Sequence, residues 1–351
     1  MRSMEAAVLH APADLRIEQV PVPENVGEKE VLIKVRAAGI CGSDLDRVMK
    51  TGTYRFPTIP GHEFCGEIAE AGSGVKDFAI GDRVAVAPML PCYACEFCQK
   101  GNYGQCDSYN FLGSRTDGGF AQYVKAPAGN LIKMPEGVSY VQGAAIEPAA
   151  VTLHGMKKIG INVGDSVAVL GCGAIGLFAI QFAKLLGATR VIAVDIAPDK
   201  LELAKQVGAH ECVNALNNDA VKSIKELTDG KGVNVAVETA GVSLTQEQCI
   251  RAAKKQGRVL YLGTAHRDVV IPPKTFECVV RNEITIAGAW NSYSAPFPGV
   301  EWHATLDFIK AGSLLIEPLI THTVKLKEAP QIFRDLAERK YPFNKVVFVM
   351  D

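Results

Sequence analysis

The sequence lacks an excess of charge of either sign, because 37 lysines and arginines stand against 38 aspartates and glutamates. Nucleic acids and acidic membranes are bound by fields of positive charge, so we expect neither as a partner. Long apolar runs are also missing, since no stretch reaches the roughly 18 to 20 residues that span a bilayer. The beginning of the chain lacks the apolar core of a signal peptide. These absences predict a cytoplasmic protein whose partner is a small molecule.

The 351 residues exceed what one hydrophobic core normally supports, which predicts two domains. Residues 1–148 contain short β-type runs separated by glycine and proline, a pattern typical of a mostly β domain. Strand-like and helical segments alternate over 149–288, which predicts a parallel sheet. We expect residues 289–351, with two amphipathic helices and a last strand, to return to the first domain. The predicted fold class is therefore α/β, with a parallel-sheet domain and a mostly β domain.

A glycine-rich turn follows the apolar segment SVAVL and opens a helical segment. It has the pattern G-x-G-x-x-G at Gly171, Gly173 and Gly176, with Ile175 inside it. Glycines at these points allow a tight turn and a close approach of the backbone to a pyrophosphate, which the helix N-terminus binds. In this context the pattern predicts a Rossmann-type dinucleotide-binding domain.

Asp195 ends the next strand-like segment. A carboxylate at this place binds both hydroxyls of the adenosine ribose and repels a 2'-phosphate, so the sequence favours NAD over NADP. Lys200 is a further candidate for the ribose, although a lysine so placed more often lies on a solvated helix face. The alternative is that the glycines only form a turn and that Asp195 caps the helix beginning at Pro198.

Four of the ten cysteines crowd one segment, with the spacing C-x2-C-x2-C-x7-C, at Cys92, Cys95, Cys98 and Cys106. In a reducing compartment such a group favours metal over disulfides. Four thiolates can hold zinc tetrahedrally, at about 2.3 Å from each sulfur. Because they leave no open position for a substrate, the sequence predicts a structural zinc. Four buried free thiols are the alternative, but the intervening residues are not core-like.

A second group of metal-binding residue types is dispersed along the chain: Cys41 in GICGSD, His62 and Glu63 in PGHE, and Glu147 in AAIEPAA. An isolated histidine or glutamate is usually structural, so none of them indicates a site alone. Their occurrence together with a zinc loop and a dinucleotide-binding fold makes them candidates for a second, catalytic metal site.

The segments GICGSD, GHE, the four-cysteine loop, GDRVAV, GGFAQY and the glycine-rich turn follow one another as in the zinc-dependent medium-chain alcohol and polyol dehydrogenases. The resemblance covers almost the full chain. Within this family LPCYACEFC, FLGSRTDGGFAQY, IEPAAVTLHG and GAWNSYSAPFPGVEW most resemble the galactitol-1-phosphate 5-dehydrogenases, and sorbitol and xylitol dehydrogenases are nearer than ethanol enzymes. The resemblance implies a GroES-like catalytic domain, a Rossmann NAD domain, two zinc ions per chain, and a homodimer or homotetramer in which the edge strand EITIAGA pairs.

By this resemblance Cys41 and His62 are ligands of a catalytic zinc, with carboxylates from Glu63 and Glu147 in place of a second cysteine. Four bound residues would fill the tetrahedron. We therefore expect the two glutamates to alternate as ligands and to leave one position for the substrate. The alternative for Glu147 is that it only caps the helix PAAVTLHGM.

Two residues that follow Cys41 are predicted to assist this site. One orients a zinc ligand, and the other passes on a proton. Asp44 is expected to orient His62, and Ser43 is the candidate that passes on the proton of the substrate hydroxyl. Asp46 stands where this family often has a histidine. A proton relay that ends at such a histidine is therefore not expected in this chain.

The predicted activity is transfer of a hydride from a secondary alcohol of a polyol or polyol phosphate to NAD, within EC class 1.1.1. Candidate substrate contacts are Arg115 first, then Tyr54 and Trp290, and Arg55 and Lys50 are further cations beside the zinc-site motifs. Arginine binds phosphate through paired charge-assisted hydrogen bonds. Alternatives are an unphosphorylated polyol of the sorbitol or xylitol type, threonine or butanediol, and a non-catalytic NAD-binding protein that keeps the structural zinc.

Overall fold

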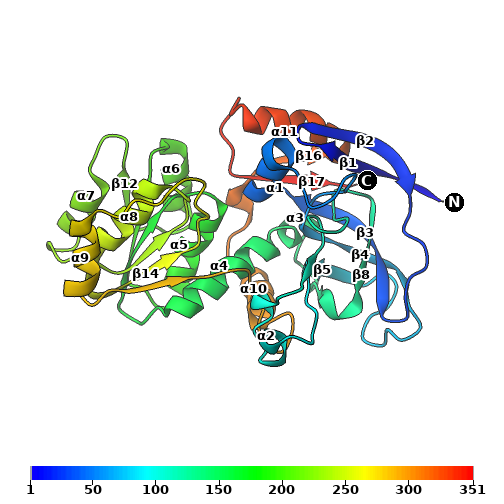
Figure 1. Cartoon of the computed structure of the whole chain (residues 1–351), viewed down its shortest axis with the longest axis horizontal. Coiled ribbons are helices and arrows are strands. Elements are labelled where there is room, and N and C mark those ends of the chain that lie inside the picture. The colour runs from blue at the N-terminus through cyan, green and yellow to red at the C-terminus, as the bar shows by residue number, and fades with distance from the viewer. Residues whose placement is uncertain (1, 351) are drawn as a thin grey trace. The chain divides into compact units, whose positions relative to one another are not determined.

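The computed structural model describes residues 2–350, which form two compact units (Figure 1). Unit 1 contains the described residues up to Glu147, Tyr293–Ala311, and those from Ile320 onward, whereas unit 2 contains Pro148–Ser292 and Gly312–Leu319. The segment Gly312–Leu319 thus differs from the predicted division, which assigned it to the first domain. Its place in unit 2 has a physical reason, because the side-chain amide of Gln181 exchanges two hydrogen bonds with the backbone of Leu315 (3.0 and 2.7 Å).

Unit 2 is built on a six-stranded parallel sheet. Its apolar central strands are buried on both faces, as expected when helices cover a parallel sheet, whereas its edge strands are partly exposed. The chain leaves β10 (Ser166–Leu170) at the point where the strand order reverses, which is where such sheets bind ligands. The strands run in the order β12 (Glu211–Asn214), β11 (Arg190–Asp195), β10 (Ser166–Leu170), β13 (Val233–Glu238), β14 (Ala253–Tyr261) and β15 (Thr285–Gly288).

The helices of unit 2 connect these strands and pack in two groups, α5 with α6, and α7 with α8 and α9. Right-handed crossovers in the observed strand order place the two groups on opposite faces of the sheet. The helices are α4 (Ile146–Ile159, whose first two residues belong to unit 1), α5 (Ala174–Leu185), α6 (Pro198–Gln206), α7 (Ala220–Glu226), α8 (Ser243–Ala252), α9 (Pro273–Arg281) and η4 (Glu317–Leu319).

Unit 1 contains a seven-stranded mixed sheet, a two-stranded hairpin and a short two-stranded ribbon. In the large sheet the strand order is β16-β17-β3-β4-β5-β9, and β8 pairs with β3 beside this path. The sheet strands are β3 (Glu30–Gly39), β4 (Glu63–Ala71), β5 (Arg83–Val86), β8 (Tyr123–Pro127), β9 (Leu131–Lys133), β16 (Ile320–Lys325) and β17 (Lys345–Val349). The hairpin is formed by β1 (Ser3–Ala11) and β2 (Asp14–Pro21), and the ribbon by β6 (Met89–Leu90) and β7 (Asn110–Phe111).

Short helical segments connect the strands of unit 1, and α11 packs against β2. The helical segments are α1 (Gly42–Asp46), η1 (Arg47–Thr51), α2 (Glu96–Gln99), η2 (Tyr103–Gln105), η3 (Ala128–Asn130), α3 (Tyr140–Gly143), α10 (Val300–Lys310), η5 (Leu326–Glu328) and α11 (Ala329–Ala337). The core beside the sheet contains Phe120, Phe333 and Phe348, whose rings contact one another. The predicted α/β class, with a Rossmann-type sheet and a mostly β second part, is confirmed.

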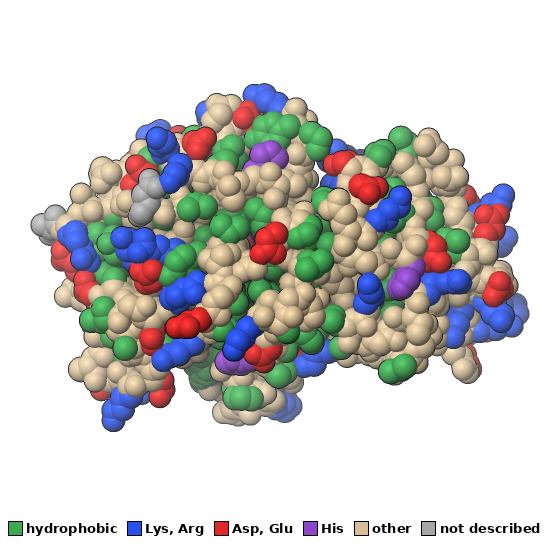
Figure 2. Space-filling view, turned by 180° about the vertical axis from the view of Figure 1, so that it is seen from behind, with side chains coloured by type: hydrophobic (Ala, Val, Ile, Leu, Met, Phe, Trp, Pro, Cys, Tyr) green, Lys and Arg blue, Asp and Glu red, His purple; other side chains and the backbone are tan. Residues whose placement is uncertain are grey.

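The surface agrees with the balanced charge of the sequence. Figure 2 shows basic and acidic side chains interspersed over the face in view, without a broad area of one sign. Between residues 2 and 350, no helix combines the length and apolar character needed to cross a membrane.

Candidate metal centres and cofactor site

Three predicted zinc ligands, Cys41, His62 and Glu63, meet at the end of adjacent strands in unit 1. Cys41 follows β3 and precedes α1, while His62 directly precedes β4, whose first residue is Glu63. One potential ligand atom from each lies within 4.8 Å of the others. His62 and Glu63 are buried and Cys41 is half-buried. Three protein donors leave the fourth position of a tetrahedron to water or substrate, as in catalytic zinc sites, so this donor set fits the ion.

His62 is oriented by Asp44. Its Nδ1 lies 3.1 Å from Oδ1 of Asp44, whose other oxygen accepts the backbone N–H of Cys41 (3.2 Å). An imidazole that donates from Nδ1 to a carboxylate presents Nε2 as the free donor to a metal. The fully buried Asp44 therefore fixes both segments that carry the donors.

The electrostatics around these donors favour a cation. Burial lowers the pKa of His62, but Asp44 and Cys41 outweigh burial and hold this pKa well above its usual value. Burial raises the pKa of Asp44, but His62 and Arg47 overcome this effect and leave the pKa below its usual value. The raised pKa of His62 shows that positive charge is stabilised at the imidazole, and the lowered pKa of Asp44 keeps ionised the carboxylate that supplies much of this effect.

Glu147 is not brought into this group of three. It lies in the first turn of α4 and is buried at 7% exposure. Burial raises the pKa of Glu147 to about 7, and the nearby Glu63 adds to the shift. Glu147 thus lies close enough to interact electrostatically with the donors, and its alternation with Glu63 as a ligand stays a prediction.

Two basic residues, Arg47 and Lys345, contact this centre. Neither of them was predicted from the sequence. Arg47 donates from Nη1 to Oγ of Ser43 (2.9 Å), one helical turn earlier, and lies 3.5 Å from Asp44. The only available signal was the spacing of four residues on a helix. Lys345 in β17 is buried and donates to Oε2 of Glu63. No local sequence pattern connects this lysine with a residue so far away in the chain.

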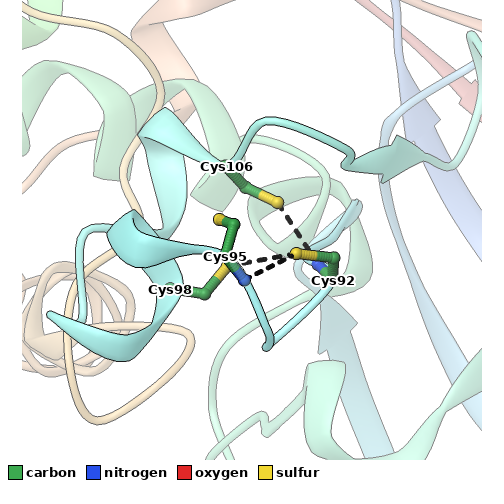
Figure 3. A group of neighbouring side chains, drawn as sticks. All are labelled: Cys92, Cys95, Cys98 and Cys106. Carbon is green, nitrogen blue, oxygen red and sulfur yellow. Dashed lines mark hydrogen bonds between the residues drawn. The ribbon is translucent and has the colours of Figure 1, made fainter.

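The four clustered cysteines gather their sulfurs at one point, as Figure 3 shows. Their four sulfurs lie within 4.8 Å of one another, and those of Cys92 and Cys98 are 3.9 Å apart. Sulfurs in a tetrahedron of about 2.3 Å zinc–sulfur bonds are separated by about 3.8 Å, so the spacing fits zinc. Cys95 is the N-cap residue of α2, and Cys106 directly follows η2. The local turns therefore hold the group together.

The chemistry of these thiols also fits a metal. Backbone N–H groups of Ala94 and Cys95 lower the pKa of Cys92 to about 6. Burial, together with Cys106 and Cys95, raises the pKa of Cys98 to about 12. A divalent cation at the centre is the charge that would make all four sulfurs thiolates.

The glycine-rich turn lies directly after β10 in unit 2. Gly171 has a φ of +102°, which favours glycine, and a Cβ on Gly176 would overlap the carbonyl oxygen of Gly171. Gly173 precedes α5, and a Cβ there would meet no atom within 4 Å. The first N–H groups of α5, including that of Ile175, have no carbonyl within the helix to bind. The turn thus offers open space and free donors to a pyrophosphate.

Asp195 ends β11 beside this turn. Its Oδ2 accepts the backbone N–H of Cys172 (2.7 Å), and its Oδ1 accepts those of Ile196 and Ala197 (2.7 and 2.9 Å). The carboxylate therefore also fixes the two residues that lead into α6, but it does not cap this helix as the alternative supposed, because the N-cap residue is Ala197, whose side chain makes no capping hydrogen bond. Lys200 lies half-buried on α6. Because each carboxylate oxygen accepts more than one hydrogen bond, these contacts leave acceptor capacity for a ribose.

We expect kcat/KM with NAD to exceed that with NADP by at least about tenfold, equivalent to about 1.4 kcal/mol, because Asp195 repels a 2'-phosphate. Replacing Asp195 with serine should narrow the gap, chiefly through KM for the cofactor. Steady-state kinetics with both cofactors measures this difference, and equal wild-type efficiencies would contradict it. Since Asp195 also binds the backbone, a melting curve of the variant must accompany the kinetics.

The candidate substrate residues are distributed over both units. Arg115 in unit 1 lies between two aromatic rings, with its guanidinium carbon 4.3 Å from the ring centre of Tyr54 and 4.4 Å from that of Tyr109. Tyr54 is 69% exposed. Trp290 is also exposed but belongs to unit 2, and its contact with substrate stays a prediction.

Comparison with protein families identifies two matching regions. Residues 27–136 match the alcohol dehydrogenase GroES-like domain, and residues 174–310 match the zinc-binding dehydrogenase domain. Galactitol 1-phosphate 5-dehydrogenase of Escherichia coli K12 is 38% identical over 346 residues, which cover 99% of this chain and all of that protein. Sorbitol dehydrogenase of Bacillus subtilis is 36% identical over 356 residues, covering 99% of this chain and 97% of that protein.

Solved structures show the same similarity in three dimensions. The crystal structure of galactitol-1-phosphate dehydrogenase from Escherichia coli matches with a TM-score of 0.94 at 38% identity, over 99% of this chain and all of that one. A zinc-binding dehydrogenase from Sinorhizobium meliloti, bound to NADP, matches with a TM-score of 0.90 at 34% identity over the same shares.

Proposed function

Because the chain belongs to the family of zinc-binding medium-chain alcohol and polyol dehydrogenases, we propose that it oxidises a secondary alcohol of a polyol phosphate with NAD. The proposal assigns the catalytic zinc to Cys41, His62 and Glu63, and the structural zinc to the four clustered cysteines. When bound, zinc supplies Lewis-acid stabilisation of an oxyanion, and NAD supplies the hydride acceptor.

The residues around the zinc donors orient groups and handle the proton. Asp44 holds Nδ1 of His62, so that Nε2 is presented to the metal. Oγ of Ser43 accepts a hydrogen bond from Arg47, and it would accept the proton of the substrate hydroxyl while its own hydroxyl proton passes on to water. Arg47 itself cannot take up a proton, because a guanidinium stays charged in proteins. We infer that Arg47 orients Ser43, and that the proton of the substrate leaves Ser43 for solvent without passing through Arg47.

Arg115 carries the proposal that the substrate is phosphorylated. Of the three cations considered from the sequence, Arg55 is paired with Asp117 and Lys50 with Asp46. Within residues 2–350, the side chain of Arg115 has no carboxylate partner and makes no hydrogen bond, only the two ring contacts. A guanidinium that contacts aromatic rings through its carbon keeps the N–H groups at its edge for the paired hydrogen bonds that phosphate accepts.

A chain of ring contacts connects Arg115 with the zinc donors. The ring of Tyr109 contacts that of Phe111 at 6.3 Å between centroids, and Phe111 contacts His62 at 5.8 Å. The guanidinium is therefore held on the same aromatic cluster as a proposed zinc ligand. This arrangement suits a substrate whose phosphate is distant from the reacting carbon, because binding energy gained there stabilises the transition state.

We expect wild type to prefer galactitol 1-phosphate over galactitol in kcat/KM. Replacing Arg115 with alanine should lower kcat/KM for the phosphate at least about tenfold, since hydrogen bonds to charged groups contribute about 1.5–3 kcal/mol. The value for galactitol should change little. Steady-state kinetics with both substrates measures these changes.

Lys50→Ala is the matched control, because it removes a nearby cation that is already paired. A loss specific to the phosphate in this control would move the phosphate site to Lys50. A wild-type preference for the unphosphorylated hexitol would instead assign the enzyme to the sorbitol type, which the 36% identity with the Bacillus subtilis relative favours as the second candidate.

We also propose a homodimer or homotetramer, formed through the edge of the sheet in unit 2. Strand β15 pairs with β14 on one side only, and its Ile286 is exposed. On the adjacent α9, Phe276 and Val280 are exposed at 60% and 65%. An open strand edge with exposed apolar side chains suits pairing with a second copy of the chain.

A further inference from the structure

Lys345 is a buried lysine behind the two segments that carry the catalytic-zinc donors. Its side chain is 3% exposed, and Nζ donates to the carbonyl oxygen of Ile40 (3.1 Å) and to Oε2 of Glu63. Ile40 directly precedes Cys41, and Glu63 directly follows His62. One ammonium group thus ties together both backbone segments from which the donors project.

Three adjacent strands build this contact. Val347 of β17 pairs with Gly39 of β3, and Gly39 pairs with Glu63 of β4. A Cβ on Gly39 would overlap Oε2 of Glu63 and lie 2.9 Å from Cε of Lys345. The glycine therefore leaves the space in which lysine and glutamate meet.

Burial of an ammonium group costs desolvation free energy. A lysine at the surface could neutralise a carboxylate at a lower cost. The arrangement of the glutamate indicates what this burial achieves. Oε2 of Glu63 is bound by Lys345, whereas Oε1 accepts no hydrogen bond from residues 2–350. Lysine thus occupies one oxygen of the carboxylate and leaves the other available to a metal.

We propose that Lys345 is a positioning residue for the catalytic zinc. It fixes the carboxylate of Glu63 so that one oxygen is directed to the donors of Cys41 and His62, and it holds the Ile40–Cys41 peptide in place. Hydrogen-bond partners of metal-binding carboxylates orient those carboxylates toward the metal in this manner. The inference rests on the proposed assignment of the catalytic zinc.

The test measures release of zinc from the full-length protein to a chelator. Wild type should release its two ions in separable phases. In Lys345→Met, loss of the catalytic zinc should be about 10–100 times easier, the usual effect of removing such a partner, while the four-cysteine zinc is retained. Lys340→Met is the control, since its ammonium is exposed and pairs with Asp335 and Glu338. Cobalt substitution reports the ligand geometry through its visible spectrum, independently of turnover.

Two further variants separate positioning from general destabilisation. Lys345→Arg keeps the charge but moves it, and we expect intermediate release even if Lys345→Met does not fold. In a Glu63→Gln background, adding Lys345→Met should accelerate release far less than it does in wild type, because both changes act on one contact.

The outcomes are distinguishable. The role of Lys345 is overturned if Lys345→Met and Lys345→Arg both release the catalytic zinc at the wild-type rate. It is also overturned if Lys345→Met accelerates zinc release equally with and without Glu63→Gln. A wild-type protein that binds only one zinc instead overturns the assignment of the catalytic zinc.

Discussion

Replacing His62 with alanine is expected to abolish turnover and to remove one of two zinc ions. His62 offers the only imidazole among the three converging donors, and its Nε2 is left free because Asp44 holds Nδ1. Without the metal, no group at this place lowers the pKa of an alcohol by the several units that bound zinc provides. We expect kcat to fall at least about a thousandfold, equivalent to about 4 kcal/mol. Polyol-dependent NADH formation and zinc per chain measure the effect.

Two controls give this result its meaning. His10→Ala removes a half-exposed histidine that pairs with Glu18 in the same unit, and it should leave turnover unchanged. The four-cysteine zinc and the melting temperature of His62→Ala should stay close to wild type, which excludes unfolding as the cause. Activity of His62→Ala within tenfold of wild type would contradict the assignment of this histidine.

Structural features that depend only on residues close together in the sequence were predictable. The four cysteines fall within one loop, so their spacing alone predicted that their sulfurs meet. The glycine-rich turn needs only the strand before it and the helix after it, and Gly171 has the left-handed conformation that the pattern requires. The alternation of strands and helices likewise predicted the parallel sheet of unit 2.

Contacts between distant strands were not predictable. Lys345 reaches Glu63 only because β17, β3 and β4 lie next to one another, and strand order is a property of the whole sheet. Position in the sequence gave no reason to choose this lysine among many. The sequence also offered Glu147 as a ligand that alternates with Glu63; in the structure Glu63 converges with Cys41 and His62, and the alternation stays a prediction.

The environment of Arg115 was predictable only in part. The loop sequence indicated a cation near the site, but many surface arginines are solvated or paired. The choice among Arg115, Arg55 and Lys50 required the structure, which shows two of them paired with carboxylates. The second ring against Arg115, from Tyr109, came from a turn of the chain that no spacing rule describes.

Replacing Cys95 with serine is expected to destabilise the protein and lower its soluble yield, with loss of the proposed structural zinc. Binding of such an ion contributes about 10–16 kcal/mol in small zinc domains, comparable to the whole net stability of about 5–15 kcal/mol of a typical protein, so even partial loss is large. Calorimetric melting and zinc per chain measure the effect. Cys212→Ser is the matched control, because Cys212 is half-buried in unit 2 and belongs to no metal-binding group among residues 2–350. If Cys95→Ser keeps the wild-type melting temperature and zinc content, the four-cysteine loop does not hold a structural ion.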